Sequence, residues 1–134
     1  MRTTRLFYFL VTVATLLLFT QCDEDHASEQ AAMKLVEDSY TQLFAGNYEG
    51  FLSARVGADS LPADYRSELL ISYKHYKAQQ ESVHGGIRGF NANRVVIDTA
   101  GHTAQVFLFI NYADSLKEEI VVPLVENDGE WKMK

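Results

Sequence analysis

Histidines and carboxylates are the side chains of this sequence that could bind a metal ion or move a proton, and their spacing decides between these uses. His75 and His84 stand nine residues apart, so on one helix, at about 100° per residue, they lie on opposite sides. His26 precedes the first predicted helix and His102 lies in a predicted turn. This spacing argues against a paired metal site, and we predict no bound metal.

Several carboxylates lie where such a side chain commonly serves the backbone. Asp98, Asp114 and Asp128 all fall at predicted turns, where aspartate accepts hydrogen bonds from nearby N–H groups. Glu118 and Glu126 could face the domain interior from a predicted strand, but the sequence gives neither an evident partner. It contains no histidine-glutamate zinc motif, glycine-rich phosphate loop or nucleophile elbow. We therefore predict no catalytic residue and no cofactor.

Aromatic side chains offer a third chemistry, the binding of a small hydrophobic molecule or a glycan. Rings from the predicted helices and from one strand could line a cavity with phenolic hydroxyls inside. These candidates are Tyr40, Phe44, Tyr73, Tyr76, Phe107 and Phe109. The same stripes are also compatible with an ordinary core in which buried tyrosines find hydrogen-bond partners.

Three predicted helices position the first four rings. Apolar residues recur at helical spacing from Ser28, a suitable N-cap, to Phe44, and Gly46 follows as a helix stop. A short helix around residues 48–54 comes next. The third helix runs from about Pro62 to Val83, because proline is tolerated in a first helical turn and a glycine pair follows its end.

The apolar period changes to two in the second half of the chain. Residues 94–97 end a first predicted strand, 103–112 form a second and 118–125 a third, and the Asp128-Gly129 pair is a hairpin signal. Pro123 cannot donate a ladder hydrogen bond, which predicts a sheet edge or a bulge. Helices followed by such strands predict an α+β domain with N-terminal helices packed on a curved antiparallel sheet.

The strand over residues 103–112 is apolar on both faces, whereas an antiparallel sheet usually leaves one face wet. Either Phe107 and Phe109 face the helices while the aliphatic residues between them pack on a second copy of the chain, or the reverse holds. A homodimer through the open sheet face is the resulting hypothesis.

The N-terminus is typical of an export signal. Arg2 and Arg5 precede an uncharged run over residues 6–19. As a helix this run would reach only about 21 Å, short of the roughly 30 Å hydrocarbon core of a bilayer. A cleaved signal over residues 1–21 is therefore favoured over a permanent anchor. Residues 22–28 then form an acidic tether, and residues 29–134 form one domain.

Composition limits what the exported chain could bind. Removal of residues 1–21 from the 134 leaves 113 residues, with 10 basic and 18 acidic side chains and a net charge of −8. A chain this acidic has no basic surface for nucleic acid, so we predict no nucleic-acid partner. Its single cysteine, Cys22, cannot form a disulfide within the chain.

Two segments resemble known families. Residues 18–22, Leu-Phe-Thr-Gln-Cys, resemble a bacterial lipobox, which implies that Cys22 carries a lipid anchor to the membrane. The following Asp23-Glu24-Asp25 resembles the surface-export signal of lipoproteins in gut-type anaerobic Gram-negative bacteria, which implies the outer leaflet of the outer membrane. A solvated tether is the alternative reading of this acidic run.

Residues 45–50 and 121–132 are similar to the turn between the first two helices and to the closing hairpin of the nuclear transport factor 2-like superfamily. With the lipobox, the chain also resembles a family of bacterial envelope lipoproteins of unknown function. The resemblance implies a cone-shaped α+β domain over roughly residues 30–134. Isomerases and dehydratases of the superfamily hold carboxylates in the cone, but no catalytic position of theirs carries over.

Two functions from different classes follow. The favoured one is a lipid-anchored, noncatalytic envelope module that binds a small ligand or another protein. The rival is an isomerase or dehydratase that uses a carboxylate in the cone. An inward carboxylate within hydrogen-bond reach of a histidine or tyrosine in an open cavity would favour the rival.

Overall fold

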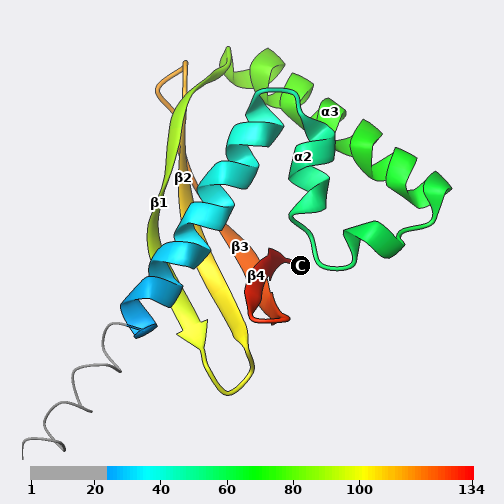
Figure 1. The fold of residues 1–134 in the computed structure, drawn as a ribbon. Helices are drawn as coiled ribbons and strands as arrows, with labels where there is room; N and C mark the ends of the chain where they lie inside the picture. The colour runs from blue at the N-terminus through cyan, green and yellow to red at the C-terminus, as the bar shows by residue number, and fades with distance from the viewer. Residues whose placement is uncertain (1–23) are drawn as a thin grey trace, which may run out of the picture. The chain divides into compact units, whose positions relative to one another are not determined.

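The computed structural model describes residues 24–134, so the predicted signal over residues 1–21 and the lipidation residue Cys22 lie outside the described residues. Residues 24–44 are helical. The elements that follow are α2 (Tyr48–Ser53), a 3-10 turn η1 (Ala58–Ser60), α3 (Ala63–His84), β1 (Ile87–Asp98), β2 (Thr103–Tyr112), β3 (Lys117–Asn127) and β4 (Glu130–Met133). All four strands are antiparallel neighbours in the order β1-β2-β3-β4 (Figure 1). The α+β prediction is confirmed.

The predicted N-cap at Ser28 is wrong, because residues 24–28 are already helical. This stretch contains neither glycine nor proline, so nothing in it interrupts a helix. The helix therefore takes in the described part of the predicted tether. Residues 24–30 and residues 31–134 belong to different compact units, and every strand lies in the second. Over residues 24–134, no helix is both long and apolar enough to cross a membrane.

One face of the sheet is buried against the helix that ends at residue 44 (Figure 1). Alternate residues of β2 point into this core, and Val106, Leu108 and Ile110 are fully buried. Val36 and Leu43 meet them from the helix. Burying a side chain of this size contributes about 1.5–3 kcal/mol, so these contacts hold the helix on the sheet.

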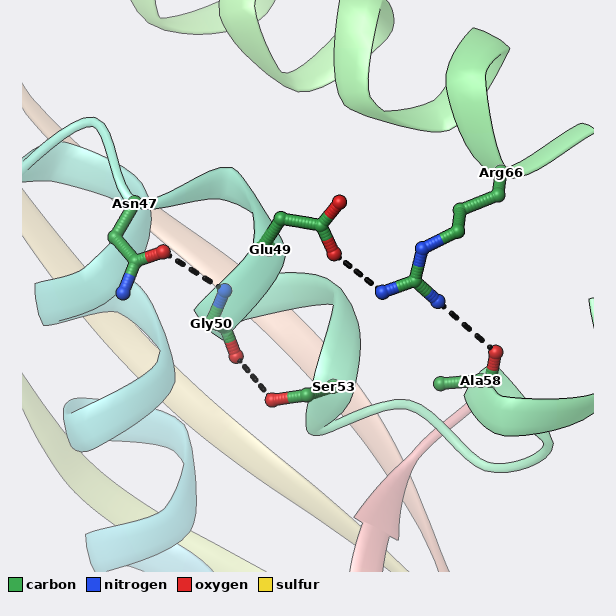
Figure 2. A network of polar contacts seen from close by, with 6 residues as sticks. All are labelled: Asn47, Glu49, Gly50, Ser53, Ala58 and Arg66. Atoms are coloured by element: carbon green, nitrogen blue, oxygen red, sulfur yellow. Dashed lines mark hydrogen bonds and ion pairs between the residues drawn. The ribbon is translucent and has the colours of Figure 1, made fainter. Parts of the chain in front are cut away.

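A polar network fixes α2 and the segment that follows it (Figure 2). The Asn47 side chain accepts a hydrogen bond from the Gly50 N–H at 3.0 Å and caps the start of α2. Arg66, near the start of α3, forms an ion pair with Glu49 on α2 and donates to the Ala58 carbonyl at 3.3 Å. Arg66 on α3 therefore holds both α2 and the connection between α2 and α3.

The outer edge of β1 carries a bulge, since the register with β2 shifts between Ala92 and Arg94. At the bulge the Ala92 N–H donates to the Glu37 Oε1 of the first helix at 2.8 Å. A helix side chain therefore satisfies a backbone group of this edge strand, beside which residues 24–134 place no further strand.

The predicted hairpin at Asp128-Gly129 and the predicted edge position of Pro123 are both confirmed. Asp128 and Gly129 have φ values of 52° and 78°, as the two-residue hairpin between β3 and β4 requires. Pro123 lies just outside the stretch of β3 that β4 covers, Leu124–Asn127, and its carbonyl accepts a hydrogen bond from the Lys134 N–H at 3.0 Å. The residue without an N–H therefore lies where this edge of β3 becomes free.

Candidate functional site

Tyr112, the last residue of β2, is the centre of a polar cluster inside the domain. It lies on the same face of the sheet as Leu108 and Ile110, and only 1% of its surface is exposed. Its hydroxyl donates to Glu118 Oε2 at 2.7 Å. Glu118 is paired with Ile110 in the sheet register, which brings its side chain to the same face, and it is solvent-exposed. The carboxylate thus sits at the rim of the cluster.

Three tyrosines of the cluster are held as neutral phenols. Burial raises the pKa of Tyr112, and its hydrogen bond to Glu118 adds to the effect. Burial also raises the pKa of Tyr76 on α3, followed by the negative charge of Glu118, while a hydrogen bond with Tyr112 opposes the rise. The pKa of Tyr40 is raised by burial, then by Tyr76, Tyr73 and Glu118. All three can therefore act as hydrogen-bond donors at neutral pH.

A chain of edge-to-face aromatic contacts leads away from this cluster. The ring centroids of Tyr73 and Phe51 are 4.8 Å apart, those of Phe51 and Tyr40 are 5.3 Å apart, and those of Tyr40 and Phe44 are 5.7 Å apart. The helix-borne candidates Tyr40, Phe44 and Tyr73 are thus brought together through Phe51 on α2, in an arrangement that stabilises aromatic pairs.

Arg55, directly after α2, brings a positive charge to this aromatic chain. Its Nη1 donates to the Tyr73 hydroxyl at 3.2 Å. Arg55 also lines a pocket of about 140 Å³ that lies where β4 stops covering β3. The complete lining is Tyr40, Phe51, Arg55, Val121, Val122, Pro123, Met133 and Lys134. A second pocket of about 190 Å³, with Phe44, Lys77 and Arg88 in its lining, lies by the start of β1.

The C-terminal end of α3 is fastened to the turn between β2 and β3. The Asp114 N–H donates to the His84 carbonyl at 3.1 Å, and the Ala113 N–H donates to the Gly86 carbonyl at 2.9 Å. His84 Nδ1 lies 2.8 Å from Asp114 Oδ2, and its ring lies 4.3 Å from that of Tyr112. The contact with His84 lowers the pKa of the Asp114 carboxyl, helped by the Leu116 N–H. Backbone and side-chain contacts therefore hold this end of the polar cluster in place.

The remainder of α3 is loosely covered. None of its 22 residues is buried, and Ile71 and Val83 are more than half exposed. Tyr73 and Tyr76 are half-buried and belong to the inward stripe. In Figure 1, α3 meets the sheet at its C-terminal end and extends past α2 at the other. Its inner tyrosines therefore pack on the edge of the core and remain half-buried.

Phe107 and Phe109 do not join the other ring candidates, and this part of the prediction is wrong. They alternate with the buried Val106, Leu108 and Ile110, so they lie on the opposite face of the sheet. There the Arg94 guanidinium lies 3.7 Å from the Phe107 ring centroid, a favourable cation–π contact. The aliphatic residues face the helices because their continuous surface fills the space beneath the first helix.

Sequence reasoning missed Tyr112, Arg55 and the partners of two glutamates. Glu118 pairs with Tyr112, and Glu126 lies 3.0 Å from the ring of His102. Continuing the strand alternation through the turn at residues 113–116 would have placed Tyr112 and Glu118 on one face. No comparable signal existed for Arg55, because it belongs to a connection. Among residues 24–134, no group of three or more histidine, cysteine or acidic side chains could hold a metal ion.

Comparison with known proteins identifies the architecture. No family model matches the chain, and no curated protein matches it. A solved structure of a protein assigned as an NTF2-like transpeptidase from Campylobacter jejuni is similar, with a TM-score of 0.62 and 12% identity, covering 75% of this chain and 94% of that one. The chain has the nuclear transport factor 2-like fold. At this identity the likeness shows the fold alone.

Within the nuclear transport factor 2-like domain, the helix-facing side therefore presents two kinds of polar group. The Tyr112 phenol and the exposed Glu118 carboxylate lie near the turn between β2 and β3, and the Arg55 guanidinium lies near the end of α2. Such groups can donate hydrogen bonds to a bound molecule and can pair with its charges.

Proposed function

We propose that this chain is a lipid-anchored module of the bacterial cell envelope that binds a small ligand noncatalytically between its helices and its sheet. The observation that carries the proposal is the cluster of neutral phenols, in which Tyr112 donates to Glu118 at 2.7 Å. A general base works best when its carboxylate is withdrawn from water and its pKa lies near the working pH. Glu118 is instead exposed and already occupied by a phenol, an arrangement suited to holding a ligand.

The location forms part of the same proposal. The lipobox-like residues 18–22 support lipid attachment at Cys22, and acyl chains contribute about 0.8 kcal/mol for each buried methylene group. The acidic residues that follow Cys22 support a location in the outer leaflet of the outer membrane. A homodimer through the face that carries Phe107 and Phe109 is a further element of the proposal, supported by their half-buried rings and the exposed Val121 beside them.

The Tyr112–Glu118 contact also favours a second candidate function, because a carboxylate within reach of a tyrosine is a feature of isomerases and dehydratases. In this alternative Glu118 would transfer a proton and the neutral phenols would stabilise negative charge on a substrate oxygen. Turnover of a carbonyl-containing substrate that is lost in Glu118→Gln and kept in Glu119→Gln would establish it.

The test of the favoured function is the intact mass of the protein extracted from its own membrane. Under denaturing conditions we expect the mass of residues 22–134 plus lipid, and a Cys22→Ser variant should lose both processing and lipid. Under native conditions we expect an additional noncovalent mass. An unprocessed, lipid-free chain would contradict the anchor, and a native mass equal to the denatured mass would contradict the retained ligand.

A further inference from the structure

The charged side chains that line the pocket beside Arg55 are basic, although the chain as a whole is acidic. The full chain has 18 acidic against 12 basic side chains, yet no acidic residue lines this pocket, whereas Arg55 and Lys134 do. Two cationic side chains and no acidic side chain therefore line this pocket, which favours a negatively charged occupant.

Arg55 has no anionic partner within the described part of the chain, unlike Arg66, the other half-buried arginine there, which pairs with Glu49. The Arg55 side chain is half-buried, and no carboxylate of residues 24–134 lies within 4.0 Å of it. Its Nη1 donates a hydrogen bond to the Tyr73 hydroxyl at 3.2 Å. A guanidinium has five N–H donors in a fixed fork, so most of its donors are left for another group. Partly removing this charge from water is costly unless an anion compensates it.

Several residues of the pocket lining are apolar and well packed. Phe51, Val122 and Met133 are each at least nine-tenths buried, and the ring of Tyr40 packs on Phe51. Phe51 packs edge-to-face on both Tyr40 and Tyr73, which fixes the wall beside the guanidinium. An occupant must therefore combine an anionic group with an apolar body.

The size of the pocket restricts that body. A volume of about 140 Å³ is below the roughly 300–1,000 Å³ of sites for drug-sized ligands. It admits one ring or one branched aliphatic group. A planar carboxylate matches the guanidinium fork with two parallel hydrogen bonds and brings one negative charge into the pocket. Arg55 and Lys134 could also donate to a phosphate, but a phosphate has more charged oxygens to remove from water against the apolar residues of the lining.

We propose that the Arg55 pocket binds a carboxylate attached to a compact apolar group, such as a single-ring aromatic acid or the C-terminal residue of a peptide. This inference rests on the proposed ligand-binding function and names the class of ligand. The carboxylate pairs with Arg55, and the apolar group lies against Phe51, Val122 and Met133.

Calorimetric titration of the detergent-solubilised full chain tests this assignment. The probes are benzoate and its neutral counterpart benzamide, N-acetyl-leucine and its C-terminal amide, and inorganic phosphate. We expect at least one of the two acids to bind at millimolar concentration or below, and at least tenfold more tightly than its amide and than phosphate. Preference for benzoate indicates a free aromatic acid, and preference for N-acetyl-leucine indicates a peptide end.

Three variants connect the binding to Arg55. Arg55→Gln should weaken binding of the acid at least tenfold, and Arg55→Lys, which keeps the charge but loses the fork, should fall between it and the wild type. Arg88→Gln removes an arginine from the other pocket and should leave the affinity unchanged. Melting curves recorded for each variant separate weaker binding from unfolding, and Arg55→Lys keeps the test valid if Arg55→Gln does not fold.

Different results would contradict the Arg55 assignment and the proposed ligand-binding function. Equal affinity for an acid and its amide, tighter binding of phosphate, or no effect of Arg55→Gln in a folded protein overturns the assignment of Arg55. If the membrane-extracted protein retains a neutral or cationic molecule, ligand binding stands and the carboxylate assignment falls. If no acid binds and no ligand is retained, both fall.

Discussion

Replacement of Tyr112 by phenylalanine removes a single hydroxyl from the centre of the polar cluster. A hydrogen bond to a charged group contributes about 1.5–3 kcal/mol, and the lower part of this range applies because water can replace the phenol at the exposed Glu118. The half-buried Tyr76 hydroxyl also loses a partner, which costs up to about 1 kcal/mol more. We expect Tyr112→Phe to lower the free energy of unfolding by about 2 kcal/mol, or roughly thirtyfold in the unfolding equilibrium.

Urea unfolding of the solubilised chain, followed by the fluorescence of its single tryptophan, Trp131, measures this loss. Tyr65→Phe is the matched control, since Tyr65 is 48% exposed and should change stability by less than about 0.5 kcal/mol. A double-mutant cycle with Glu118→Gln should give a coupling energy of about 1 kcal/mol. A loss no larger than that of Tyr65→Phe, or additive effects in the cycle, would refute the role given to this contact.

Alkaline pH provides an independent measurement of the same cluster. The pKa of Tyr112 is raised above 10.0 in the folded protein, so its contribution is fully present below pH 10 and is lost as the pH rises further. Because the unfolded chain releases this proton first, the wild type should lose up to about 1.4 kcal/mol per pH unit for each such phenol. The slope should be shallower in Tyr112→Phe. Equal slopes above pH 10 would contradict the origin assigned to the shift.

Three further changes test the frame around the site. Leu108→Ala should destabilise the protein by about 2–5 kcal/mol in chemical denaturation, whereas Val83→Ala, at a side chain 63% exposed, should change stability by less than about 0.5 kcal/mol; similar losses would contradict the core described above. Arg66→Ala and Glu49→Ala should each lower the free energy of unfolding by about 0.5–1 kcal/mol in the same assay. Because the two side chains form an ion pair, the double variant should lose less stability than the sum of the single variants, and additive losses would contradict the pair. Asp114→Asn should lower the melting temperature at pH 7. The contribution of the lowered carboxyl pKa is fully present above pH 3.8 and is lost as the pH falls through the folded pKa, so the curves of variant and wild type should converge below pH 3.8. A constant difference down to pH 2 would contradict the pairing with His84.

The sequence predicted the elements well because each is encoded by local patterns. Residues 103–112 are rich in β-branched and aromatic residues and lie between two turn signals, and the strand observed there has the predicted bounds. Glycine after each of the first and third helices, and the Asp128-Gly129 pair, mark turns whose positive φ values the structure confirms. The start of the first helix was predicted wrongly because a capping residue such as Ser28 marks a boundary only where the preceding residues do not continue the helix.

The site was less predictable because it depends on which face of each element turns inward. Both faces of β2 are apolar, so alternation alone could not decide between Phe107 and Leu108 as the inner residue. Arg55 and Tyr73 are 18 residues apart and meet only after α2 and α3 have packed. A contact of that kind is set by tertiary packing, and a short-range pattern cannot predict it.

The contact between Glu37 and the bulge of β1 has a consequence for the behaviour of the protein in a crowded compartment. Exposed edge strands recruit strands of other chains, and proteins commonly block them with bulges and charged side chains. Here the first helix supplies the blocking carboxylate to the Ala92 N–H, so the edge is shielded only while that helix is docked. Any partial detachment of the helix would expose both the apolar face of the sheet and its edge at once. The same helix thus protects the protein from aggregation as well as completing its core.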